Sequence, residues 1–142
     1  FEKMLNASIM TYSLEEIVIE KLRGVLQNTK KIHENTWARS RVRDYFDLWN
    51  IFQVYSNQIQ FDKCRDLFPR KCAIKNIIFN GFEDFFDPRF VENARSQWGA
   101  WLSPLVRDLP SFGQVLFDLR NTIEEIFKAR PVVSDSQTIK PL

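Results

Sequence analysis

The sequence predicts a mainly α-helical, bundle-like domain with at most one short strand, which would lie near the beginning of the chain. Ser13 and Ser111 are each followed three positions later by Glu or Gln, the capping-box pattern that opens a helix. Asp87-Pro88 also indicates a helix start, because aspartate caps free backbone amides and proline suits the first helical position. Apolar residues at helical spacing follow these signals.

One domain accounts for the length and composition of the chain. The 142 residues are 44% hydrophobic and 27% charged, and 13 are phenylalanine, so we expect a well-packed single helical domain over residues 1–128. Residues 129–142 lack an apolar period and are expected to form a flexible tail. No uncharged apolar run approaches the roughly 18 residues that cross a bilayer, so we expect a cytoplasmic protein without membrane contact.

Local patterns predict the first elements. Residues 7–13, ASIMTYS, alternate weakly and are rich in strand formers, which favours one short strand. The capping box of Ser13 and Glu16 predicts a first helix from Leu14 to about Leu26. Residues 28–38 are polar and basic without a period, so they are predicted to form a loop.

The remaining elements are helices. A second helix is predicted from about Arg39 to Ser56, and a third from Phe61 to Phe68, with Pro69 beginning a new helix rather than interrupting one. The starts at Pro88 and after Ser111 predict the last two long helices.

Metal or thiol chemistry finds little support in the sequence. Cys64 and Cys72 are eight positions apart and are expected to be free and buried. His33 is the only histidine and is expected to be solvated in the basic loop, so neither a zinc site nor a Cys/His nucleophile is predicted.

Lys21 occupies an unusual place in the first helix. At 100° per residue it lies in the middle of the apolar stripe that includes Ile17, Leu22 and Val25. A buried ammonium is costly unless it reaches solvent, a carboxylate or an anionic ligand.

The second helix presents the complementary carboxylates. Asp44 and Asp47 are interspersed with apolar residues and are expected to be partly enclosed, where Lys21, Arg41 or Arg43 could keep them ionised. One interpretation is an internal ion pair that only ties two helices together. The other is a polar cleft in which the lysine neutralises phosphate oxygens and an aspartate holds metal or accepts a proton.

Two motifs resemble those of AbiEii/AbiGii-type nucleotidyltransferase toxins, which belong to abortive-infection toxin–antitoxin pairs. They are YSLEEIVIEKLRGV at residues 12–25 and RVRDYFDLW at residues 41–49. The E-K-L motif is matched by Glu20-Lys21-Leu22, and the R-x-(K/R)-D-x-x-D motif by residues 41–47. FEDFFD and RSQWGAWL are similar to later helices of the family, so the resemblance covers most of residues 10–120.

This resemblance implies the C-terminal helical portion of an enzyme that transfers a nucleotide from an NTP with Mg²⁺, for some members to the 3′ end of tRNA. Lys21 and Arg41 would then bind the nucleotide, and Asp44 and Asp47 would be the catalytic residues. A cognate antitoxin is an implied partner. The basic residues next to these motifs would contact RNA: Lys30, Lys31, Arg39 and Arg43.

The sequence departs from the family pattern in one respect. It contains neither the Gly-Gly/Ser turn nor the D-x-D pair that such enzymes carry on strands, and it opens at Phe1 without an initiator Met. We therefore expect a fragment that is inactive alone and holds no metal. The alternative is a stand-alone helical interaction module that binds an antitoxin without catalysis; the sequence indicates no oligomeric state.

Overall fold

The computed structural model describes residues 13–36 and 40–128, and within these residues it contains five α-helices and no strand. The helices are α2 (Leu14–His33), α3 (Val42–Tyr55), α4 (Phe61–Ile74), α5 (Pro88–Leu102) and α6 (Phe112–Phe127), with short 3-10 helices η1 (Ser56–Gln58) and η2 (Phe82–Phe86). The predicted helical fold is confirmed. The strand predicted at residues 7–13, apart from Ser13, and the predicted tail lie outside the described residues.

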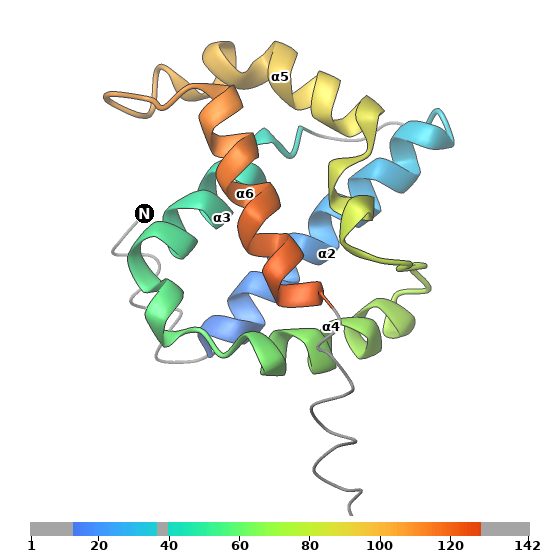
Figure 1. The fold of residues 1–142 in the computed structure, drawn as a ribbon. Helices are drawn as coiled ribbons and strands as arrows, with labels where there is room; N and C mark the ends of the chain where they lie inside the picture. Colours follow the sequence, from blue (N-terminus) through green and yellow to red (C-terminus); the bar gives the residue numbers. More distant parts are fainter. Residues whose placement is uncertain (1–12, 37–39, 129–142) are drawn as a thin grey trace, which may run out of the picture.

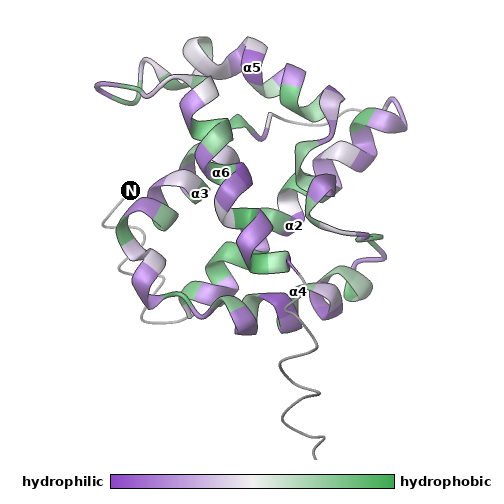
Figure 2. Cartoon of the chain, in the orientation of Figure 1, coloured by the Kyte–Doolittle hydropathy of each residue, from purple (hydrophilic) through white to green (hydrophobic). Residues whose placement is uncertain are grey.

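The helices surround one hydrophobic core. Helix α2 packs against α3, α4 and α5, and α6 packs against α3 and α4. In Figure 1, α5 lies across one end of α6 and α4 across the other. Hydrophobic and hydrophilic residues alternate along each helix (Figure 2), as expected of amphipathic helices that bury one face. This arrangement places α2, which carries Lys21, between α3 and α4.

Three helix starts were predicted correctly from their capping residues. The hydrogen bonds are Glu16 N to Ser13 Oγ (3.1 Å), Arg89 N to Asp87 Oδ1 (2.9 Å) and Gln114 N to Ser111 Oγ (3.2 Å). Each bond satisfies a backbone amide that has no partner within its helix. The capping box of α2 is complete, because Glu16 also accepts a hydrogen bond from the Ser13 amide.

The end of α2 was predicted wrongly. The helix continues beyond Leu26 to His33, so residues 28–33 are helical rather than part of a loop. The last turn of α2 contains the basic residues Lys30, Lys31 and His33. The helix dipole favours cations at this end of a helix. Asn35, at φ 55°, then ends the helix with hydrogen bonds from residues 35 and 36 back to residues 32 and 31, the Schellman arrangement.

The prediction for Pro69 was also wrong. Helix α4 runs through Pro69 to Ile74 without a new start. Pro69 is exposed, so the carbonyl that loses its helical hydrogen bond lies on the solvent side of the helix. Asn76, at φ 56°, ends α4 as Asn35 ends α2.

Replacing Asp87 with alanine is expected to lower the free energy of unfolding by about 1 kcal/mol at neutral pH, because α5 loses its cap. Partial burial acts to raise the pKa of Asp87, but hydrogen bonds from His33 and from two backbone amides lower it below its usual value. The carboxylate therefore stabilises the fold above about pH 4, and this contribution is lost as the pH falls through the lowered pKa.

Urea denaturation of both proteins across pH 2–7 measures this difference. The difference in free energy of unfolding between wild type and Asp87→Ala should narrow as the pH falls below about 4. A gap that stays constant down to the lowest pH would contradict a role for the ionised carboxylate.

Candidate functional site

Lys21 joins two aspartates at the contact between α2 and α3. Its Nζ lies 3.0 Å from Asp47 Oδ2 and 3.6 Å from Asp44 Oδ1. Arg41 Nη1 approaches Asp44 Oδ2 at 3.3 Å, so two cations face two carboxylates. The sequence left open which aspartate Lys21 would meet, and the structure places both within reach. These four residues are named the Lys21 cluster below.

The carboxylates of the cluster are much less accessible than its cations. The side chains of Asp44 and Asp47 are 11% and 10% exposed, whereas those of Lys21 and Arg41 are each 27% exposed. Burial raises the pKa of Asp44 above its ordinary value, against the opposing effect of Lys21 and Arg41. Asp44 is therefore a carboxylate whose proton affinity is higher than that of an aspartate in water.

Gly24 allows α3 to approach α2 at this cluster. A Cβ atom at this position would lie 3.1 Å from Asp44 Oδ2 and 3.4 Å from Arg41 Nη1. Sequence analysis did not identify Gly24, although it lies three positions after Lys21 and therefore close to it on the helix surface. Only the packing of the two helices gives this glycine its role.

Replacing Gly24 with alanine is expected to lower the free energy of unfolding by about 1 kcal/mol. The added methyl crowds a carboxylate that Lys21 and Arg41 hold in place, and this cost outweighs the gain in helix propensity. Gly99 in α5 is the matched control, since a Cβ there meets no atom within 4 Å. Gly99→Ala should stabilise the protein by about 0.5–1 kcal/mol. Urea denaturation of both variants measures whether the free energy of unfolding falls in Gly24→Ala and rises in Gly99→Ala.

Lys21 also lines a pocket. The pocket has a volume of about 500 Å³ and is lined by Glu16, Ile17, Glu20, Lys21 and Lys71. Lys71 comes from α4, so the pocket lies at the contact between α2 and α4. Its volume is within the range of pockets that bind small molecules.

The residues predicted to contact RNA are not part of this cluster. Lys30 and Lys31 lie in the last turn of α2 and Arg43 in the first turn of α3, and all three are exposed. Arg39 lies outside the described residues. His33 is helical, not part of a loop as predicted, and its Nε2 lies 2.7 Å from Asp87 Oδ2.

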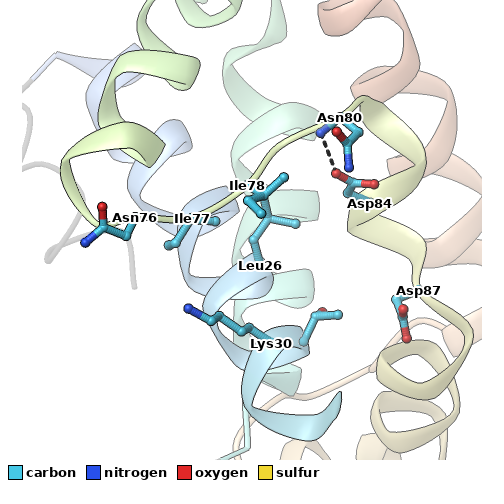
Figure 3. A pocket seen from close by; sticks show the side chains of 9 residues that line it. Leu26, Lys30, Asn76, Ile77, Ile78, Asn80, Asp84 and Asp87 are labelled. Atoms are coloured by element: carbon cyan, nitrogen blue, oxygen red, sulfur yellow. Dashed lines mark hydrogen bonds between the residues drawn. The ribbon is translucent and has the colours of Figure 1, made fainter. Parts of the chain in front are cut away.

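A second pocket, of about 310 Å³, shares no lining residue with the first. Figure 3 shows Leu26 and Lys30 of α2 facing the chain between Asn76 and Asn80. Its acidic residues serve structural roles: Asp84 accepts a hydrogen bond from the Asn80 amide at 2.8 Å, and Asp87 caps α5. We assign this pocket no chemistry.

The described residues do not form a complete metal site. No group of three or more His, Cys, Asp or Glu side chains among them could hold an ion. Asp44 and Asp47 both already face cations. Cys64 and Cys72 are free and buried, as predicted, and burial raises the pKa of their thiols to about 12 and about 11.

Comparison with protein families agrees with the motifs that form the Lys21 cluster. The family model described as nucleotidyl transferase AbiEii toxin, type IV TA system, matches residues 1–129. The chain belongs to this family. Comparisons with curated proteins and with solved structures gave no match.

Membership of the AbiEii family has direct implications. As a nucleotidyltransferase family it implies an NTP and a metal ion in general terms, and as a toxin family of type IV toxin–antitoxin systems it implies an antitoxin partner. No helix among the described residues is long and apolar enough to span a membrane.

Proposed function

We propose that this chain is the C-terminal, helical part of an AbiEii enzyme that transfers a nucleotide from an NTP to an acceptor, with the 3′ end of tRNA as the candidate acceptor. The observation that carries the proposal is the position of Lys21. Its ammonium is held by two buried aspartates, and the residue also lines a pocket of about 500 Å³.

The contacts of each residue in the Lys21 cluster suggest its role in the reaction. Lys21 and Arg41, the more exposed members, contact the triphosphate. Asp44 accepts the proton of the attacking hydroxyl, whose oxygen bonds to the α-phosphorus as pyrophosphate leaves. Asp47, 3.0 Å from Lys21, orients the ammonium. The raised pKa of Asp44 supports its role as proton acceptor, because a general base works best when its pKa approaches the working pH.

Mg²⁺ does not fit the described residues of this chain. The cluster offers two carboxylates, and a lysine and an arginine already occupy positions beside them. We therefore propose that the metal ligands belong to a part of the enzyme outside this sequence, which contains no D-x-D pair. The isolated chain is then inactive.

Transfer of labelled nucleotide tests this function. The full-length protein is incubated with Mg²⁺, tRNA and each of the four NTPs labelled at the α-phosphate, in parallel with residues 1–142 alone. The full-length protein should label the tRNA from at least one NTP, and the chain alone should not. No labelling of tRNA by the full-length protein with any of the four NTPs would overturn the proposal.

The exposed basic residues support an RNA acceptor. Lys30, Lys31 and Arg43 point their charge to solvent and can neutralise phosphates without disturbing the core. Binding of tRNA should therefore weaken as the salt concentration rises, and Lys30→Gln/Lys31→Gln should reduce the slope of this dependence.

The alternative function is an antitoxin-binding helical module without catalysis. Six large apolar side chains among the described residues are more than half exposed and favour it: Val54, Ile74, Ile78, Trp101, Leu105 and Phe117. The two functions are distinguished by Lys21→Ala. Catalysis requires this lysine, whereas antitoxin binding through the apolar side chains does not.

A further inference from the structure

A second lysine lines the same pocket as Lys21. Lys71 belongs to α4, and three of the other lining residues, Glu16, Ile17 and Glu20, belong to α2 with Lys21. The pocket thus has a lysine on each of the two helices that line it. Sequence analysis did not connect Lys71 with Lys21.

The other charged groups of the pocket already have partners. Glu20 forms an ion pair with Arg23, Glu16 accepts a hydrogen bond from the Ser13 amide, and Lys21 is paired with the two aspartates. Lys71 is half-buried, yet among the described residues it forms no hydrogen bond or ion pair. Its charge is therefore available to an anion that enters the pocket.

We propose that Lys71 is a second phosphate-contacting residue, which binds the NTP phosphates together with Lys21. The inference rests on the proposed function and extends it to a residue that the family motifs of this sequence do not include. Lysines on two neighbouring helices suit the several negative charges of a triphosphate, and lysine contacts phosphate as a point charge. Ile17 provides apolar surface in the same pocket.

Calorimetric titration of the full-length protein with Mg²⁺ and each NTP, and separately with inorganic tripolyphosphate, tests the proposal. Lys71→Gln should raise the Kd for both ligands about tenfold, because a charge-assisted contact is lost. Lys71→Arg should retain most of the affinity. The matched control is Lys75→Gln, at an exposed lysine at the end of the same helix that does not line the pocket, and it should bind as wild type does. The melting temperature of Lys71→Gln should equal that of wild type, since no ion pair is broken.

The outcomes separate this inference from the proposed function. If Lys21→Ala loses NTP binding while Lys71→Gln binds both ligands normally, Lys71 has no role and the proposed function stands. If wild type binds tripolyphosphate through Lys71 but transfers no nucleotide, the pocket is a polyphosphate site and the proposed function fails. If wild type binds neither ligand, both are overturned.

Discussion

Replacing Lys21 with alanine is expected to reduce nucleotide transfer by the full-length protein at least about a hundredfold and to lower the free energy of unfolding by about 2–3 kcal/mol. Activity falls because the triphosphate loses a positioned cation. Stability falls because Asp44 and Asp47, each 7% exposed, are left without the ammonium that lies 3.0–3.6 Å from them. The stability cost is below that of a fully buried pair, since Lys21 is 27% exposed and Arg41 still faces Asp44.

A double variant separates the two effects. Lys21→Met with Asp47→Leu replaces the closer ion pair by apolar side chains of similar length, a change that often restores stability. Asp44 keeps Arg41 as its partner. We expect the double variant to be more stable than Lys21→Met alone and to remain inactive. Urea denaturation and the nucleotide-transfer assay measure the two properties on the same samples.

If the double variant recovered activity together with stability, the proposed contact between Lys21 and the triphosphate would be contradicted. That outcome would mean that Lys21 only joins α2 to α3, which is the internal ion pair that the sequence also allowed. A third variant, Lys21→Arg, retains a cation at the same position. Partial activity in Lys21→Arg with none in Lys21→Met would support a contact between this side chain and an anion.

Three helix starts were predictable from the sequence, and the ends of α2 and α4 were not. Ser13, Asp87 and Ser111 act through hydrogen bonds to residues two or three positions away, so a local pattern contains all the information. The ends of α2 and α4 are made by Asn35 and Asn76 at positive φ. Asparagine tolerates that conformation less readily than glycine, so its presence in a polar stretch is a weaker signal.

The candidate site was predictable in its residues and only partly in its geometry. Helical periodicity placed Lys21 in an apolar stripe and Asp44 and Asp47 in partly apolar surroundings, and the contacts are as expected. The roles of Gly24 and Glu15 depend on tertiary packing. Glu15 is 5% exposed and accepts a hydrogen bond at 2.7 Å from the amide of Gln60, which is 45 positions away. No spacing along one helix predicts such a contact.

Replacing Phe68 with alanine is expected to lower the free energy of unfolding by about 3–5 kcal/mol, a large share of the stability of a domain of this size. Phe68 is completely buried at the centre of an aromatic cluster. Its ring centroid lies 4.9 Å from that of Phe79, 5.4 Å from Phe85 and 5.5 Å from Phe127. Truncation removes these contacts and leaves a cavity that the surrounding rings fill only partly.

The aromatic cluster around Phe68 also holds α4, the helix that carries Lys71, in place. Phe68 and Lys71 are three positions apart on α4. If truncation of Phe68 loosens the packing of α4, Lys71 can shift relative to α2, against which α4 packs. Phe117→Ala is the matched control, because Phe117 is 64% exposed on α6 and its loss should change stability by no more than about 0.5 kcal/mol. Urea denaturation compares the two variants, and equal losses would show that the buried aromatic cluster does not anchor α4. Under conditions where Phe68→Ala remains folded, its affinity for tripolyphosphate should fall while that of Phe117→Ala stays at the wild-type value.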